Sequence, residues 1–217
     1  MVSTLLSKNA TALLTNIDTT TIAETAFMLR PPLIKNESDA EKAGKGTSFG
    51  IASITDFPES GYLSSTERQI IVQEQNNVAQ KYSLQPHDVM LSIVGSIGRV
   101  AIIGPDYNGK MVPSSNIVII RMHEPSAQKA ILCGMFYKSA IGQQILADLT
   151  HGKTIPLISK KTLASTPFPA ATEKNLAAAL ALFEQETLAE EKCRQLREDI
   201  KTARSNFLID DTHSSAN

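Results

Sequence analysis

The chain has 217 residues, of which 42% are hydrophobic, and a formal net charge of −1. This is enough apolar material for one domain of ordinary size with an appendage, and the near-neutral charge argues against a strongly basic nucleic-acid-binding protein. The charge is uneven, because residues 173–211 hold nine acids and six bases, which leaves the remainder slightly basic.

No segment is apolar over the length that a membrane span needs, and the start lacks the features of a signal peptide. We therefore expect a cytoplasmic protein. The two cysteines, Cys133 and Cys193, are far apart in the sequence, so neither a disulfide framework nor a metal site is predicted. A glycine-rich cofactor loop after a strand is also missing, and no cofactor is expected.

Residues 1–20 are a poorly patterned lead-in rich in Ser, Thr and Asn. Residues 21–29 can form a turn or two of helix, which Pro31 and Pro32 must end because proline cannot continue a helix and restricts the residue before it. A strand is predicted for 49–54, followed by a turn-rich loop up to Tyr62.

Two β-branched apolar runs flank Gly95-Ser96-Ile97-Gly98 within the segment 88–103, a pattern typical of two strands joined by a tight turn. The glycines can be purely structural, or they can let the tip approach a ligand closely. Residues 116–121 predict another buried strand, and 126–149 predict helix with a break near Ser139. The expected fold class is therefore α/β in the α+β sense, with a mixed or antiparallel sheet plus helices in a domain spanning residues 21–171.

The segment 151–161 alternates apolar residues with cations and hydroxyls. The apolar residues can anchor it while the polar ones face outward, and Lys, Thr and backbone N–H groups near Gly152 are donors suited to phosphate oxygens. A solvated loop before the next helix is the structural alternative. The outward-facing candidates are Lys153, Thr154, Ser159, Lys160 and Lys161.

A long helix is predicted for 172–208, followed by a disordered tail at 209–217. Thr172 is a good N-cap, Glu173 suits the first turn, and neither Pro nor Gly interrupts the helix up to Phe207. Its distal apolar residues alternate steps of four and three, as in a coiled-coil seam, with a similar stripe out of phase nearer the domain. Such a helix pairs with a second copy or folds back on its own domain. The expected partner-helix residues are Leu180, Phe183, Cys193, Leu196, Ile200 and Phe207.

The order and spacing of these segments resemble the specificity subunit of type I restriction-modification enzymes. The residues that carry the resemblance are the hairpin 88–102, the strand 116–121, Ser139-Ala-Ile-Gly-Gln-Gln, His151 to Lys161, Thr166-Pro-Phe-Pro, the early segment 50–57 with Gly61-Tyr62, and the long helix. The resemblance implies a target recognition domain that reads half of a divided DNA site, followed by a spacer helix. Family members usually carry two such domains and two antiparallel helices that hold them apart, so this chain resembles a half-subunit whose two copies pair through their helices. A fragment of a longer chain and a related phage-defence system remain alternatives.

The resemblance also implies how the site would work. Cations and hydroxyls of the 151–161 segment would contact phosphates, while Arg99 would take guanine in the major groove and Ser96 would contact a phosphate or a base. Asn116 is a further candidate for the same interface. The implied partners are double-stranded DNA, a DNA adenine methyltransferase subunit and a restriction subunit.

No catalytic grouping is visible in the sequence. The Asn/Asp-Pro-Pro-aromatic motif of an amino-methyltransferase is absent, and the four histidines are scattered without a nucleophile–base arrangement. We therefore predict no enzymatic activity for the chain alone. Two alternatives stay open: an RNA-binding module, suggested by the Gly-x-x-Gly tip, and an interaction protein that acts through its long helix.

Overall fold

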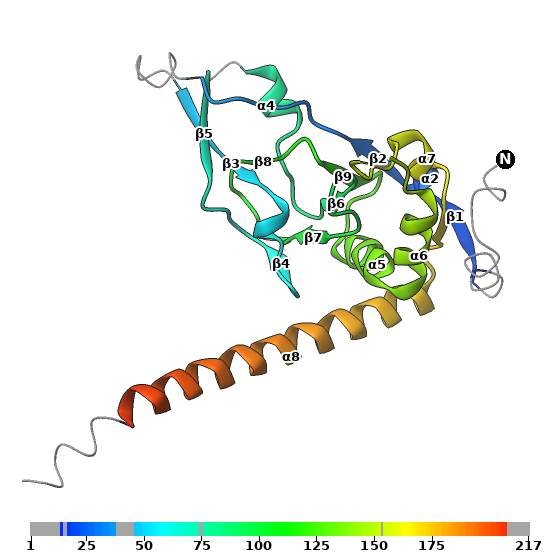
Figure 1. Cartoon of the computed structure of the whole chain (residues 1–217). Coiled ribbons are helices and arrows are strands. Elements are labelled where there is room, and N and C mark those ends of the chain that lie inside the picture. The colour runs from blue at the N-terminus through cyan, green and yellow to red at the C-terminus, as the bar shows by residue number, and fades with distance from the viewer. Residues whose placement is uncertain (1–13, 15–16, 38–45, 74–75, 153, 208–217) are drawn as a thin grey trace, which may run out of the picture.

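The central element is a five-stranded sheet in the computed structural model, which describes residues 14, 17–37, 46–73, 76–152 and 154–207 (Figure 1). The strand order is β2-β9-β6-β7-β4, antiparallel throughout except for the parallel β4–β7 pair. Its strands are β2 (Ala26–Leu29), β4 (Tyr62–Leu63), β6 (Val89–Ser92), β7 (Val100–Ile103) and β9 (Ile117–Met122).

The central strands read as unbroken apolar runs because both faces of this sheet are covered. Val89 and Leu91 of β6 lie in one core cluster, with buried residues of the long helices, whereas Met90 between them lies in a second cluster with Phe57 and Met111. Side chains of a strand alternate between the two faces, so a sheet buried on both sides has no polar positions to spare. The sheet is therefore the middle layer of the domain.

A second, three-stranded sheet packs beside the first, in the order β5-β3-β8. It consists of β3 (Gly46–Ala52), β5 (Gln69–Gln73) and β8 (Met111–Pro113), with β5 antiparallel and β8 parallel to β3. Short elements lie around it, namely η2 (Ile54–Asp56) and α4 (Asn77–Lys81). The expectation of a mixed sheet with helices is confirmed.

A third sheet has two strands, one from the start and one from the end of the globular domain. β1 (Thr19–Thr21) runs antiparallel to β10 (Pro167–Pro169), and α2 (Ile22–Thr25) follows β1 directly. The helix predicted for 21–29 is thus wrong in its second half, since the chain turns into β2 after Thr25 and pairs with β9. Long-range strand pairing has overridden the local helical pattern here.

Two helices cover one face of the central sheet, α5 (Ala127–Lys138) and α6 (Ala140–Leu149). The predicted break falls at Ser139, which ends α5 and caps α6 by accepting a hydrogen bond from the Gly142 amide. A short helix, α7 (Lys160–Ala164), leads to β10.

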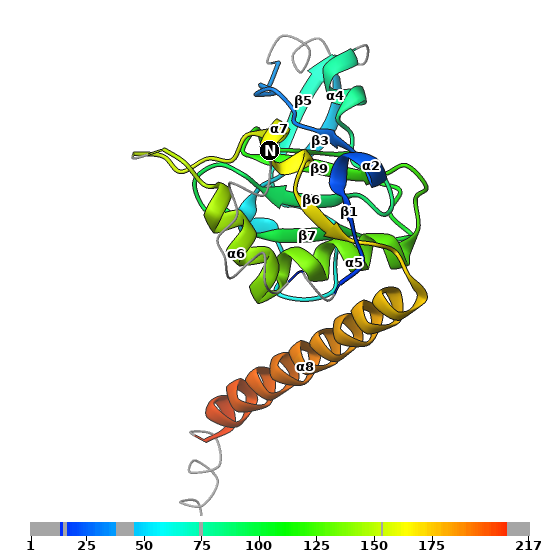
Figure 2. The ribbon, with the colours of Figure 1, turned by 90° about the vertical axis from the view of Figure 1, so that its right-hand side faces the viewer.

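The last helix, α8 (Glu173–Asn206), begins where predicted, with the Thr172 hydroxyl accepting a hydrogen bond from the Asn175 amide. Its 34 residues extend about 50 Å at 1.5 Å per residue. The first half packs on α5 and the second half leaves the body, so that every residue from 191 to 207 is exposed (Figures 1 and 2).

The structure differs from the sequence-based expectation for two of the partner-helix residues. Phe183 is 7% exposed and lies 5.0 Å from the Tyr62 ring, while Leu180 is partly buried against the same core. These side chains are covered within the chain. The other four residues expected to contact a partner helix are exposed: Cys193, Leu196, Ile200 and Phe207.

Neither end of the predicted organisation can be compared in full. The lead-in 1–20 and the tail 209–217 fall wholly or mostly outside the described residues. Among the helices described, none has the length and apolarity that a membrane crossing requires.

Candidate nucleic-acid interface

The glycine-containing tip between β6 and β7 is held in a fixed shape by buried polar contacts. The Ser92 hydroxyl donates to the Ser96 carbonyl at 2.6 Å and accepts from the Arg99 amide at 2.9 Å. Gly95 and Gly98 have φ values of 76° and 87°, which favour glycine. The predicted strand–turn–strand unit is confirmed, and Ser96 stands exposed at its tip.

The tip is also tied to α6 by Gln143. The Gln143 Nε2 donates to the Gly98 carbonyl at 2.9 Å and to the Tyr137 carbonyl at 2.6 Å. A Cβ atom at Gly98 would lie 2.7 Å from Gln143 Oε1. Gly98 therefore has a structural role, whereas a Cβ at Gly95 would meet open space.

Two segments distant in sequence converge beside this tip through backbone hydrogen bonds. The Ile93 amide donates to the Asn116 carbonyl and the Ile158 amide donates to the Ile93 carbonyl, both at 2.9 Å. The Gly95 amide donates to the Pro156 carbonyl at 2.9 Å. The hairpin tip, the turn before β9 and the 151–158 segment thus form one rim of the sheet, which we call the recognition rim.

The 151–158 segment is a narrow loop that projects from the body beside α6 and α7 (Figure 2). His151 and Leu157 exchange two backbone hydrogen bonds, of 3.0 and 2.8 Å, across its base. Gly152 has a φ of 102°, and a Cβ there would run into the Ile155 carbonyl oxygen. Thr154 is exposed in this loop, while Lys153 lies outside the described residues.

The predicted cations follow directly at the start of α7. Lys160 and Lys161 are exposed, as expected for phosphate contacts. Ser159 has a different task, because its hydroxyl caps α7 by accepting from the Thr162 amide at 3.0 Å and bonds the Thr162 hydroxyl at 2.7 Å. Ser159 therefore positions the two lysines instead of standing free as a donor.

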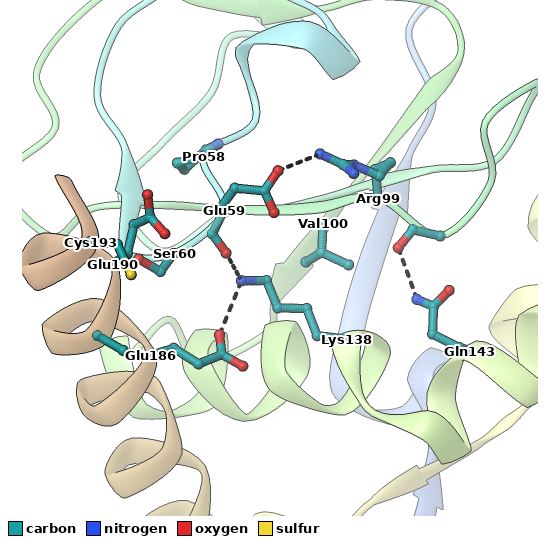
Figure 3. A pocket seen from close by; sticks show the side chains of 12 residues that line it. Pro58, Glu59, Ser60, Arg99, Val100, Lys138, Gln143, Glu186, Glu190 and Cys193 are labelled. Carbon is teal, nitrogen blue, oxygen red and sulfur yellow. Dashed lines mark hydrogen bonds and ion pairs between the residues drawn. The ribbon is translucent and has the colours of Figure 1, made fainter. Parts of the chain in front are cut away.

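Arg99 lies apart from the other candidates although it follows the tip. Its guanidinium pairs with Glu59 at 3.3 Å and lines a cleft of about 490 Å³ between the body and α8 (Figure 3). Lys138 closes the same corner by donating to the Glu59 carbonyl at 2.8 Å and pairing with Glu186 at 3.3 Å. The structure thus brings Ser96, Asn116 and Thr154 to the recognition rim, has Lys160 and Lys161 follow the rim at the start of α7, and places Arg99 in the cleft.

Arg30 is a cation at the rim that the sequence did not single out. Its Nε donates to the Ser115 carbonyl at 3.1 Å, and the residue is exposed next to the turn that holds Asn116. The pairing of β2 with β9 carries it there. That pairing joins residues about 90 positions apart, so no local pattern around Pro31 and Pro32 could have indicated it.

One conspicuous ion pair, at the opposite end of β6 and β9 from the rim, is structural. Asp88 is fully buried and accepts two hydrogen bonds of 2.7 Å from Arg121, whose Nη2 also donates to the Ser83 carbonyl at 3.1 Å. Burial raises the pKa of Asp88, and the Arg121 guanidinium opposes that rise. The pair locks β6 to β9 and satisfies charges that neither strand could bury alone.

The described residues offer no group of three or more His, Cys, Asp or Glu side chains that could hold a metal ion. The interface therefore consists of exposed hydroxyl, amide and cationic groups on rigid turns and one helix start. Such groups suit contacts to phosphates and base edges.

Comparison with known proteins gives matches at the level of structure. No family model and no curated protein matches the sequence. The fold is similar to that of the type I restriction-modification S subunit from M. genitalium, with a TM-score of 0.51 and 16% identity over 93% of this chain and 45% of that one. The fold is also similar to that of a chain from a structure on complex assembly and conformational transition of the type I restriction-modification system. The TM-score is 0.53 and the sequence identity 16%, over 88% of this chain and 47% of that one.

A further match is the type IIG restriction endonuclease BpuSI, with a TM-score of 0.57 and 9% identity over 83% of this chain and 28% of that one. The chain spans less than half the length of each of these proteins. Its fold is therefore similar to that of about one half of a type I specificity subunit, with one globular domain followed by one long helix.

Proposed function

We propose that this chain is a sequence-specific DNA-recognition subunit of a type I-like restriction-modification system, acting in the cytoplasm on one half of a divided site. The observation that carries the proposal is the structural match over about nine tenths of the chain to specificity subunits, of which it covers one half. The composition of the recognition rim supplies the second support.

The recognition rim has the chemistry that such a reader needs. Lys160, Lys161 and Arg30 are cations on ordered backbone and would set register by contacting phosphates. Ser96, Asn116 and Thr154 carry hydroxyl or amide groups that would read base edges from the projecting tip, turn and loop. Reading from rigid turns keeps these donors and acceptors at fixed positions, which favours sequence discrimination.

We assign no reaction to the chain itself and infer that methyl transfer is performed by a separate methyltransferase subunit. The similar chain from a type I system comes from a structure concerned with complex assembly, and BpuSI contains the fold within a much longer endonuclease. In both cases this chain is similar to only a part of the matched protein chain. A DNA adenine methyltransferase and a restriction subunit are the partners that we propose here.

Two copies would form a complete reader by pairing through α8. The exposed distal half of the helix carries Leu196, Ile200 and Phe207 at 60, 52 and 74% exposure. Large side chains at coiled-coil spacing on an isolated helix are unfavourable in water. Pairing would place two recognition domains at a fixed separation, and a rigid spacer sets the distance between half-sites.

DNA binding provides the direct test. The full chain, alone and with its methyltransferase partner, is first used to select binding sequences from a random duplex library. Its affinity for the enriched duplex is then compared by fluorescence anisotropy with its affinity for a scrambled duplex. We expect a preference of at least tenfold for the enriched sequence. Equal affinity for both duplexes, even with the partner present, would refute the proposal.

The proposed phosphate contacts of the two lysines in α7 can be tested with a double substitution and a control double substitution that removes the same charge elsewhere. Lys160→Ala/Lys161→Ala should weaken binding to all duplexes and reduce the slope of log affinity against log salt by about two, roughly one for each phosphate that is no longer neutralised. Lys129→Ala/Lys174→Ala removes the same charge from α5 and α8 and should leave the slope unchanged. If an RNA of the same sequence binds more tightly than the duplex, the RNA-binding alternative is favoured instead.

A further inference from the structure

Ile155 is a large apolar side chain that the structure leaves exposed at the recognition rim. It is 58% exposed in the narrow loop that projects from the body beside α6 and α7 (Figure 2). The apolar residues that follow it face inward, since Pro156 and Leu157 are partly buried and Ile158 is fully buried. These residues anchor the loop, whereas Ile155 contributes little to the folding of the chain.

The backbone fixes where the Ile155 side chain stands. Two hydrogen bonds between His151 and Leu157 close the base of the loop. Gly152 has a φ of 102°, and a Cβ atom there would run into the Ile155 carbonyl oxygen. Pro156 also restricts the residue before it to extended conformations. Ile155 is therefore held in place before any ligand binds, which lowers the entropic cost of binding.

Ile155 lies beside the polar tip of the β6–β7 hairpin. The loop and the hairpin meet in antiparallel register, with the Gly95 amide donating to the Pro156 carbonyl at 2.9 Å. Ser96 follows Gly95 and Ile155 precedes Pro156, so the register brings these two residues to neighbouring positions at the end of the contact. Both are exposed. The rim thus presents a hydroxyl group next to an apolar side chain.

The surroundings of Ile155 restrict what it can bind. Its described neighbours in the loop and at the start of α7, namely Thr154, Lys160 and Lys161, are polar and exposed. A docking surface for another protein needs a contiguous apolar patch, which one side chain among polar residues does not provide. In the major groove of DNA, the apolar group is the C5-methyl of thymine, and it lies next to the O4 acceptor of the same base.

The shape of the loop suits entry into that groove. The major groove is about 12 Å wide and admits a two-stranded ribbon. The loop is such a ribbon at its smallest, because His151 and Leu157 pair across its base and Ile155 stands beyond them. Lys160 and Lys161 stay at the body, where phosphates beside the groove would lie.

We propose that Ile155 is a specificity-determining residue that reads a thymine by packing against its C5-methyl group in the major groove, with the Ser96 hydroxyl donating to O4 of that base. The inference rests on the proposed function and deepens it by naming a base. The alternating pattern of this segment predicted apolar anchors and polar contacts, so Ile155 was not among the sequence-based candidates.

Replacing thymine by uracil tests the contact, because uracil lacks only the methyl group. Each thymine of the enriched duplex is replaced in turn, and the affinity of the full chain is measured by fluorescence anisotropy, with the methyltransferase partner present. We expect one position at which the replacement weakens binding roughly fourfold, the factor for losing one buried methyl-sized group. Ile155→Ala should bind the thymine and uracil duplexes equally, because its side chain no longer reaches the methyl.

Two variants serve as controls. Ile155→Val keeps two methyl groups on Cβ and should retain most of the discrimination between thymine and uracil. Val78→Ala shortens a similar aliphatic side chain, 42% exposed on α4, and should leave the discrimination unchanged. The slope of log affinity against log salt should stay the same in Ile155→Ala, since no charge is lost.

Several results would overturn the inference and leave DNA reading intact. These are an enriched half-site without thymine, equal affinity for the thymine and uracil duplexes at every position, and discrimination that persists in Ile155→Ala. A loss in Ile155→Ala that is the same for enriched and scrambled duplexes would show a contact that reads no base, such as insertion between base pairs. If the unsubstituted chain prefers no duplex at all, the proposed function fails and the inference fails with it.

Discussion

The two halves of α8 have opposite environments although one uninterrupted helix contains both. In the proximal half, residues 173–190, Ala179 and Phe183 are buried against the body. In the distal half, residues 191–207, no side chain is buried, although Leu196 and Ile200 are as apolar as the residues that the body covers. Burial here is decided by what lies opposite the helix. The proximal half therefore contributes to the stability of one chain, and the distal half is available to another.

The largest loss of stability is expected where the body buries charge. Arg121→Met leaves Asp88 buried without its partner, and breaking such a pair costs about 3–5 kcal/mol. Urea unfolding monitored by circular dichroism measures this loss. A cost below about 1 kcal/mol would show that Asp88 gains water in the variant.

The same variant should respond to pH. Burial already raises the pKa of Asp88, and removing Arg121 removes the group that opposes the rise. A carboxyl whose folded pKa exceeds its unfolded value takes up a proton on folding, so stability falls as pH rises through the folded pKa. The deficit of Arg121→Met relative to the unsubstituted chain should therefore be larger at pH 8 than at pH 5, and the opposite trend would contradict this assignment.

Within α8, two adjacent residues give a direct contrast. Phe183→Ala should cost about 3 kcal/mol, because it opens a cavity beneath Tyr62 and the α5–α8 contact. Leu182→Ala, one position away and 44% exposed, should cost less than about 0.5 kcal/mol in the monomer. Thermal unfolding at submicromolar concentration, where pairing is suppressed, compares the two. Similar costs would mean that the proximal half is not distinguished by burial.

The same contrast explains how far the sequence could predict the fold and site. The hairpin tip, the break at Ser139 and the start of α8 at Thr172 follow from glycine, cap and periodicity signals that act within a few residues. The distal seam was predicted for the same reason. Local signals could not indicate what covers Phe183, because that depends on a neighbour from β4 far away in sequence.

At the recognition rim, too, the sequence predicted what local signals determine and missed what tertiary contacts determine. Lys160 and Lys161 were found because they stand in one short polar segment, and their exposure agrees with the prediction. Arg30 was missed because β2–β9 pairing brings it to the rim, and the direction of Arg99 is set by Glu59, which comes from a distant loop. Side-chain direction at a turn depends on such tertiary partners and is not encoded by spacing.

A smaller effect is expected at the junction between the body and the helix. Lys138→Met breaks the links to the Glu59 carbonyl and to Glu186 while keeping the apolar stem, so it should cost about 1 kcal/mol or less. Raising the salt concentration should therefore reduce the difference in stability between the unsubstituted chain and the variant. A much larger cost would mean that this corner holds α8 in place.

The smallest effect on folding is expected from removing the distal half altogether. A chain ending at Glu190 keeps Ala179, Phe183 and Glu186 in their contacts with the body and deletes only residues that are exposed or lie outside the described ranges. Its unfolding free energy should stay within about 0.5 kcal/mol of the full chain measured as a monomer. Light scattering at micromolar concentration should nevertheless give a dimer for the full chain and a monomer for the shortened one.

Ending the chain at Pro169 is a poorer experiment, because it would uncover the core that Phe183 closes and confuse loss of pairing with loss of folding. Leu196→Asp is the matching point substitution, since it should prevent pairing by placing an unpaired charge in the seam while leaving the body unaltered. If the chain ending at Glu190 remains dimeric, pairing must involve the body or the proximal helix. The functional division between the two halves of α8 would then be wrong even though their burial differs.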